Sequence, residues 1–245
     1  MYDFYDAPIS NDTQKRLRHN LKALYESIPE TEGCLENIAK EDGCGSKCCE
    51  YQNPSVFYIE FLNTWNTVKT TWSKKQIISL IVKSIRNYLN TNLSKGCVFW
   101  EKETKKCLQH KTRPYNCRTY CQVPDEEFKP RYERLKVLYD SSPGSVLLDQ
   151  CKLAKTVGIP PTAEEMTNWF AELQLLERDI GVAPADIHDG DGGSYRTYHD
   201  HILLKIGSQA FLNKLIQIRS LGESKEKDRF VDLLEEQLIA GVIKI

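Results

Sequence analysis

The sequence has no long hydrophobic run. No stretch of it approaches the ~20 consecutive apolar residues that a bilayer-spanning helix needs, so we expect no membrane partner. The first six residues, Met1–Asp6, are acidic and lack the basic start and apolar stretch of a signal peptide. From these two absences we expect a cytoplasmic protein.

An excess of charge of either sign is also missing. The 245 residues include 33 Lys and Arg against 34 Asp and Glu, a net charge of −1, so no basic surplus argues for a nucleic-acid partner. Phosphate-binding loops, GxGxxG, GxSxG, HExxH and the CxxxCxxC radical motif are all absent. The sequence therefore carries no signature of the common nucleotide-binding, hydrolase or metalloprotease sites.

Cysteine, in contrast, is abundant and clustered. Eight of the nine cysteines lie between Cys34 and Cys121, and only Cys151 falls outside. In a reducing cytosol structural disulfides are rare, and clustered thiols bind metal or do redox work. The total is odd, and Cys48 and Cys49 are neighbours, which rarely pair with each other but can both face one metal site. We therefore interpret the cysteines as metal ligands rather than as disulfides.

The pattern of apolar residues indicates an α+β fold. Helical spacing predicts helices, and short β-branched and aromatic runs predict strands. The expected helices cover residues 10–28, 73–89, 132–139, 162–180, 198–220 and 224–242, and the expected strands cover 55–62, 96–100 and 107–112. Asn11 or Asp12 is expected to cap the first helix, and Thr162 with Glu165 forms a capping box. Residues 31–53 and 181–194 read as loops.

This pattern predicts two domains. A small cysteine-rich metal-binding module with short strands embedded among helices is expected in residues 1–155, and a helical region packed on it in 156–245. Because the loop at 31–53 has little apolar surface, we expect metal to contribute directly to its folding.

Two groups of cysteines carry the chemistry. The first is Cys44, Cys48 and Cys49, on a loop that contains Gly45. In the second group nine residues separate Cys97 from Cys107 and nine more separate Cys107 from Cys117, and Cys121 follows. Thiolates are strong ligands for zinc and for the iron of iron–sulfur clusters. Two strands with a turn would bring Cys97 near Cys107, and a turn at Arg113-Pro114 would return Cys117 to them.

The second group resembles the YkgJ-type CxxCxxCC cysteine-cluster family. The resemblance rests on Gly96-Cys97-Val98-Phe99-Trp100 and on Cys107-x5-Arg113-Pro114-x2-Cys117-Arg118, and it spans about residues 34–122. It implies a zinc- or iron-chelating domain, related to the cysteine-rich region of flagellin lysine N-methylases, which carry an iron–sulfur cluster. The first group departs from the family, since three residues separate Cys44 from Cys48, and His110 stands where the family has tyrosine.

There are more candidate metal ligands than one ordinary metal site needs. A tetrahedral zinc or a [4Fe–4S] cluster needs about four protein ligands. The candidates are Cys34, Cys44, Cys48, Cys49, Cys97, Cys107, Cys117 and Cys121. Either there are two metal centres, or some thiols surround the site without binding. Cys151 is interpreted as a small buried side chain, with a distant ligand as the alternative.

Basic residues near the thiols are candidates for contact with the cofactor. Arg113, Arg118 and Lys47 would offset the negative charge of bound thiolates, although the arginines could equally cap strands or form salt bridges. His110 is expected beside the site. Two further groupings, His188-Asp189-Gly190-Asp191 and His199-Asp200-His201, contain metal-ligand residue types, but solvated loop residues and a helix N-terminus explain them as well.

Three functions remain open from the sequence. The first is an iron–sulfur or zinc protein that acts as, or with, an enzyme modifying a peptide or a small molecule. The second is a non-catalytic, metal-stapled module that docks on a protein partner through its helical C-terminal half. The third is metal trafficking or sensing. No catalytic residue is identified.

Overall fold

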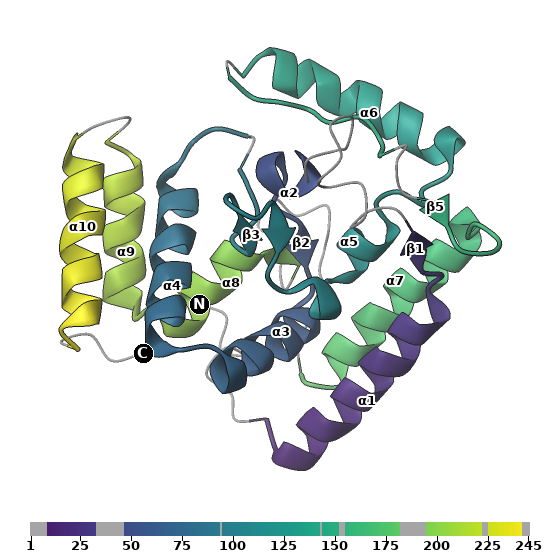
Figure 1. The fold of residues 1–245 in the computed structure, drawn as a ribbon, viewed down its shortest axis with the longest axis horizontal. Coiled ribbons are helices and arrows are strands. Elements are labelled where there is room, and N and C mark those ends of the chain that lie inside the picture. Colours follow the sequence, from purple (N-terminus) through teal and green to yellow (C-terminus); the bar gives the residue numbers. More distant parts are fainter. Residues whose placement is uncertain are drawn as a thin grey trace.

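The computed structural model describes residues 9–32, 47–93, 95–142, 144–151, 155–181, 195–221 and 225–241. Helices dominate, accompanied by three antiparallel pairs of two-residue strands, which confirms the α+β class (Figure 1). The helices are α1 (Asn11–Ser27), α2 (Lys47–Tyr51), α3 (Tyr58–Thr71), α4 (Lys74–Leu89), α5 (Tyr115–Thr119), α6 (Asp125–Asp140), α7 (Ala163–Arg178), α8 (Tyr198–Ile206), α9 (Gln209–Arg219) and α10 (Lys225–Ile239). None of these described helices is long and apolar enough to cross a bilayer.

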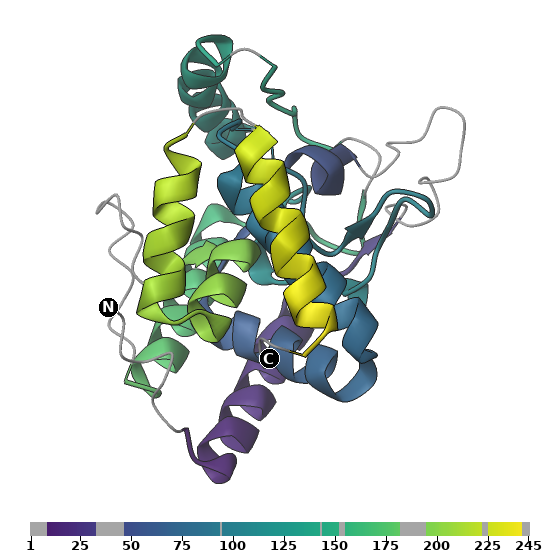
Figure 2. The same cartoon turned by 90° about the vertical axis from the view of Figure 1, so that its left-hand side faces the viewer.

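The larger core lies among α3, α4, α8, α9 and α10. Ile78, Ile81, Ile85 and Leu89 recur along one face of α4 and are buried, as their helical spacing predicts. Around α4 lie α8, α9 and α10, the last two side by side at one end of the molecule (Figures 1 and 2). The same core reaches Cys97, Val98 and Phe99, so the first cysteine of the second group is attached directly to the main hydrophobic core.

A second core lies among α1, α7 and the start of α3. Leu17, Leu21 and Leu24 of α1 are buried against Trp169 and Leu173 of α7. Phe57 and Ile59 belong to this core, whereas Tyr58 and Phe61 belong to the larger one. The first turn of α3 therefore joins the two cores, and the cysteine-bearing segments lie above it, between the two groups of helices (Figure 1).

The strand pairs connect distant parts of the chain. β1 (Thr31–Glu32) pairs with β5 (Lys155–Thr156), and β2 (Ser55–Val56) pairs with β6 (Arg196–Thr197). β3 (Trp100–Glu101) pairs with β4 (Lys106–Cys107) as a short hairpin. Because β6 leads directly into α8, the second pair holds the first turn of α8 next to the start of α3.

The expected strand at residues 55–62 is wrong beyond its first two residues. The chain turns into helix α3 at Tyr58, and Tyr58, Phe61, Trp65 and Val68 are buried at helical spacing. The aromatic and β-branched residues at the start of this segment gave a strand pattern. The helical period becomes visible only when the window extends to Val68, since α3 is buried on two sides.

Smaller corrections concern helix ends. Ser10, not Asn11 or Asp12, caps α1 by accepting from the N–H of Thr13. The single helix expected over 198–220 is two helices, because the chain leaves helical geometry at Gly207 and Ser208 caps α9. Helix α6 begins at Asp125 and continues through Pro130, which was expected to precede it. In α10, helical spacing predicts that Leu233 faces the core, but this side chain is 48% exposed. Val231 is buried instead, together with Leu234 and Leu238.

The predicted loops and the predicted domain boundary are tested only in part. Residues 47–51 of the expected loop form α2, and residues 33–46 lie outside the described residues, as do residues 182–194 of the other expected loop. The division into domains near residue 155 stays a prediction. Helices from both sides of that position share each of the two cores.

Candidate metal centre

Cys48 and Cys49 lie on the short helix α2. Their sulfur atoms are 4.0 Å apart, and both side chains are half-buried. The carbonyl of Cys49 accepts a 2.7 Å hydrogen bond from the backbone N–H of Cys97. The first cysteine group is thereby attached to the second through the backbone.

Gly96 makes this close approach possible. A Cβ atom at position 96 would lie 2.6 Å from the carbonyl oxygen of Glu50, a distance that real Cβ atoms do not show. The Gly96 carbonyl also accepts a 2.6 Å hydrogen bond from the Asn87 side chain on α4. The glycine of the Gly-Cys-aromatic segment therefore has a steric role, which is to let Cys97 lie against α2.

We expect Gly96→Ala to separate Cys97 from α2. The clash is with backbone, which must shift, so we expect a loss of about 1–3 kcal/mol in the free energy of unfolding and weaker metal retention. Thermal unfolding and metal content of the purified variant test this. Gly158→Ala is the control for metal retention, since its φ of +87° adds backbone strain while a Cβ there meets no atom within 4 Å. Full metal retention in Gly96→Ala would contradict the role given to Gly96.

Cys107 is held by the β3–β4 hairpin. Its Cα pairs with that of Trp100, and the N–H of Leu108 donates to the carbonyl of Phe99 at 2.9 Å. The expected strands at 96–100 and 107–112 are thus confirmed only around this turn, and His110–Thr112 forms a 3₁₀ turn instead. Lys83 of α4 donates to the Trp100 carbonyl and fixes the hairpin to the core.

Cys117 lies on α5, whose start is fixed by a buried carboxylate. The Cys117 N–H donates to the carbonyl of Pro114 at 3.0 Å. The backbone N–H of Tyr115 donates to Glu60 Oε1 at 2.6 Å, and the Tyr25 hydroxyl donates to the same oxygen at 2.6 Å. The other oxygen of Glu60 accepts from the N–H of Phe57 at 3.0 Å. Glu60 therefore joins α1, α3 and α5 at one buried point.

Glu60 has a role that the sequence did not predict. It lies within the apolar run 56–62 and is 1% exposed. Burial raises its pKa, while the three hydrogen bonds and the nearby Arg118 act in the opposite direction. The available signal was an acidic residue in an otherwise apolar aromatic segment, since a buried acid is retained only with partners.

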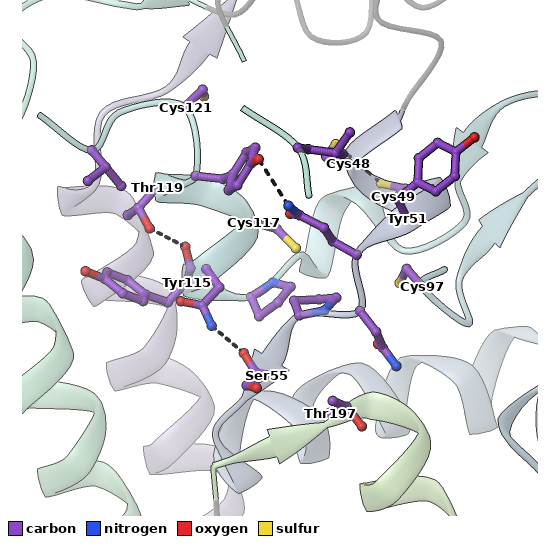
Figure 3. A pocket seen from close by; sticks show the side chains of 18 of the residues that line it. Cys48, Cys49, Tyr51, Ser55, Cys97, Tyr115, Cys117, Thr119, Cys121 and Thr197 are labelled. Atoms are coloured by element: carbon purple, nitrogen blue, oxygen red, sulfur yellow. Dashed lines mark hydrogen bonds between the residues drawn. The ribbon is translucent and has the colours of Figure 1, made fainter. Parts of the chain in front are cut away.

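A large cavity lies in front of the thiols. It has a volume of about 1190 Å³, and its walls include Cys48, Cys49, Cys97, Cys107, Cys117, Cys121 and Cys151. In Figure 3 the sulfur of Cys117 points from α5 toward the side where Cys49 and Cys97 lie, whereas Cys121 lies apart, beyond Thr119. The two cysteine groups thus converge on one cavity.

Each of the five thiols acts electrostatically on the pKa of at least one of the others. Burial, followed by the charges of Cys97, Cys107 and Cys48, raises the pKa of Cys117 well above its ordinary value. Burial and the charge of Cys107 raise the pKa of Cys97 to about 12. The hydrogen bond with Cys49 lowers the pKa of Cys48. Several thiolates cannot coexist in such a place without a cation.

This donor set suits zinc or an iron–sulfur cluster. Soft thiolates in a half-buried pocket select these centres, and a metal cation supplies the positive charge that lets the thiols lose their protons. Cys48, Cys49, Cys97, Cys107 and Cys117 are the described residues that would hold it. In the described parts of the chain, however, no three His, Cys, Asp or Glu side chains are close enough together to hold a single metal ion.

The remaining cysteines divide into two sets. Cys121 and Cys151 are both half-buried and border a second, smaller cavity of about 470 Å³. Their charges interact, since Cys151 contributes to the raised pKa of Cys121 after burial does. Cys34 and Cys44 lie outside the described residues. The ligand roles given to all eight candidate cysteines stay predictions, and Cys151 is half-buried rather than buried.

Of the three residues predicted to contact the cofactor, Arg113 and His110 border the cavity and Arg118 does not. Arg113 lies on the cavity wall, 3.4 Å from His110 Nε2, and its guanidinium also donates to Thr31. Burial and the charges of Arg113 and Arg118 lower the pKa of His110. Arg118 is not part of the wall. It donates to the carbonyl of Arg113 at 2.9 Å and stacks over the Tyr25 ring at 4.1 Å.

Lys83 is a cation that the sequence analysis did not single out. Burial lowers its pKa, and the charges of Cys97 and Glu103 are the largest opposing influences. Lys47, expected to balance thiolate charge, is exposed at the cavity edge.

The two histidines of the grouping His199-Asp200-His201 lie in different surroundings. His201 is fully buried and stacks on Phe61 at 5.0 Å, with Nε2 3.0 Å from the Val56 carbonyl, so it belongs to the core. His199 is 4% exposed and borders the cavity. The grouping at His188 lies outside the described residues.

Among known proteins, one family model matches part of the chain. No curated protein and no solved structure matches the chain. Residues 40–135, a segment that contains all five converging thiols, match the model of a family with the description "CxxCxxCC: Putative zinc- or iron-chelating domain". The match supports a cysteine-ligated metal-binding protein. This segment, less than half of the chain, is thus similar to the CxxCxxCC family that the spacing of the cysteines resembles.

Proposed function

We propose that the converging thiols hold an iron–sulfur cluster that serves an enzymatic reaction on a peptide or a small molecule bound in the adjoining cavity. One observation carries this proposal: five thiols from three separate segments form part of the wall of a cavity of about 1190 Å³. A purely structural zinc site is closed on all sides by its ligands and the protein. A metal centre on a cavity wall can instead be reached by a substrate.

The spacing of the thiols favours a cluster over a single ion. At a Zn–S distance of about 2.3 Å, the sulfur atoms of a tetrahedral zinc site lie about 3.8 Å apart. Cys48 and Cys49 approach this spacing, at 4.0 Å, but the described residues offer no group of three for one ion. A [4Fe–4S] cluster is larger than one ion and takes four cysteines that stand further apart.

The cluster would supply electron transfer or a Lewis-acidic iron to the cavity. The protein supplies the surrounding binding surface. One wall presents aromatic and aliphatic side chains from α6, namely Phe128, Tyr132, Leu135 and Tyr139, and Phe128 stacks on Tyr132 at 5.7 Å. Polar and cationic side chains line the part of the cavity near the start of α8. Such a cavity suits a ligand with both apolar and polar parts.

Purification without oxygen tests the cluster directly. We expect a brown protein with a broad absorption in the visible range and with iron and acid-labile sulfide in equal amounts by elemental analysis. Oxidation in air should bleach the colour and release iron. A colourless protein that retains zinc alone would contradict the iron–sulfur form and leave a zinc centre with the same ligands.

A second candidate function is docking to a protein partner through the C-terminal helices. Ile216 of α9 and Leu233 and Ile239 of α10 are 56%, 48% and 64% exposed, and because α9 and α10 lie side by side they are the candidates for an apolar contact surface. Because α8 and α10 share the core with α4, deletion of residues 160–245 would expose that core, so point variants are the sharper test. Ile216→Ser with Leu233→Ser should abolish co-purification of a partner while metal content is unchanged. Unchanged partner binding would contradict the docking function.

A further inference from the structure

Two cations border the same cavity. Lys95 and Arg219 both border it, Lys95 from the segment before Cys97 and Arg219 from the end of α9. Among the ion pairs of the described residues, neither takes part in one. Both are half-buried, and the guanidinium of Arg219 stacks over the Tyr88 ring at 4.9 Å.

The two cations act on the same region. Burial lowers the pKa of Lys95, and the positive charge of Arg219 lowers it further, while Asp200 opposes them. His199 experiences the charges of both cations after its own burial and Asp200. Lys95, Arg219 and His199 therefore surround one part of the cavity. Like charges held together in a half-buried place destabilise the free protein unless an anion joins them.

Among the described residues, Asp200 is the acid whose charge acts on both Lys95 and His199. Asp200 Oδ2 accepts from the Thr197 hydroxyl at 2.6 Å, and Oδ1 lies 3.4 Å from His199 Nε2. Its charge also lies in the first turn of α8, where an acid is favoured. Asp200 thus offsets part of the charge of Lys95 and Arg219, and one positive charge remains in excess.

Asn53 supplies a free polar atom at the same place. The Nδ2 atom of Asn53 contacts His199 Nδ1, and its Oδ1 atom is buried with no hydrogen-bond partner among the described residues. An anion can be bound here when the amide is turned over, so that the oxygen faces His199 and the NH₂ group faces the cavity. Because an amide can present either its oxygen or its NH₂ group, Asn53 can donate to an anion once His199 Nδ1–H pairs with the oxygen. A buried polar atom without a partner is costly, which points to a ligand atom at this position.

We propose that Lys95, Arg219 and Asn53 form an oxyanion-binding subsite that holds a phosphate or carboxylate group of the ligand in the cavity. Arg219 offers a planar pair of donors, Lys95 a point charge, and Asn53 an amide donor, the combination that recognises phosphate and carboxylate oxygens. Lys95 is separated from Cys97 by Gly96 alone. A ligand anchored here by its anionic group therefore extends past the thiols.

This inference names the ligand class for the cavity of the proposed function, but its test does not depend on the metal. The probes are inorganic phosphate and acetate, titrated into the full-length protein by isothermal titration calorimetry, with sodium chloride to keep ionic strength constant. Saturable binding of either probe is expected. Tighter binding of phosphate identifies a phosphorylated ligand, and tighter binding of acetate identifies a carboxylate.

Three variants locate the bound anion. Lys95→Gln and Arg219→Gln should each weaken binding of the preferred probe at least tenfold. Arg219→Lys keeps the charge and the fold and should weaken it less than Arg219→Gln does. Lys214→Gln removes the same charge from an exposed position on α9 that does not border the cavity, and should change binding less than twofold.

Two results would overturn the subsite. One is the absence of saturable binding of both probes to the wild-type protein. The other is binding that Lys95→Gln and Arg219→Gln affect no more than Lys214→Gln does. Metal content separates the two proposals. Anion binding by a protein without a cluster supports the subsite and contradicts the proposed function. A brown protein that binds neither probe supports the cluster and contradicts the subsite.

Discussion

Cys117→Ser is expected to lose most of the bound metal and to unfold far more easily than the wild type. Cys117 is half-buried on the cavity wall, and the charges of three other thiols act on its pKa, so it lies centrally among the converging cysteines. Serine is a poor ligand for soft metals. Since the free energy of metal binding contributes to folding, we expect the unfolding midpoint to fall by about 10 °C, which corresponds to several kcal/mol for a chain of this size.

Metal content per chain and thermal unfolding measure this effect. Cys151→Ser is the matched control, because it removes one thiol that borders the cavity but is not among the five converging cysteines. The control should retain at least most of the metal and its unfolding midpoint. Equal metal content in Cys117→Ser and the wild type would exclude Cys117 as a ligand. Chelation of the wild-type metal should reproduce the stability of Cys117→Ser.

Glu60→Ala is expected to have the next largest effect. It leaves the Tyr115 N–H, the Phe57 N–H and the Tyr25 hydroxyl without their acceptor in a buried place. Each unsatisfied buried donor costs about 1–3 kcal/mol, so the sum is on the order of 4 kcal/mol in the free energy of unfolding. Because Tyr115 begins the helix that carries Cys117, metal affinity should also fall.

Glu60→Gln separates the hydrogen bonds from the loss of volume. Its amide oxygen can keep the contacts with Tyr115 and Tyr25, but its NH₂ group then faces the Phe57 N–H, so we expect a loss of about 1–3 kcal/mol. Glu172→Gln, an exposed change on α7, should stay within about 0.5 kcal/mol of the wild type. Chemical denaturation measures all three variants. A Glu60→Ala variant as stable as Glu172→Gln would show that the buried carboxylate does not hold α5.

The helices that could be predicted are those with one apolar face. In α4 and α7 the spacing of Ile78, Ile81 and Ile85, and of Trp169 and Leu173, fixes both the helix and its buried side. Helix α3 could not be recognised in the same way, since its first turn contributes to both cores and its apolar residues are not confined to one side.

The cysteine spacing predicted the hairpin of Cys97 and Cys107 and the return of Cys117. It could not reveal Glu60, Asn53, Lys95 or Arg219, because each acts on a residue far away in the chain. Glu60 contacts Tyr115, and Asn53 contacts His199, which are 55 and 146 positions away. Contacts at such separations depend on how the helices pack, which no local pattern records.

The sequence by itself determined the α+β class, the main amphipathic helices and the metal-binding chemistry, because periodicity and thiol ligation are properties of short segments. The tertiary structure decided which cysteines converge and what lies opposite them. Pairing of β2 with β6 and packing of α8 on α4 bring the start of α8 to the cysteine-lined cavity. Only that packing, driven by burial of the shared core, places cations, thiols and an amide oxygen without a partner among the described residues around one space.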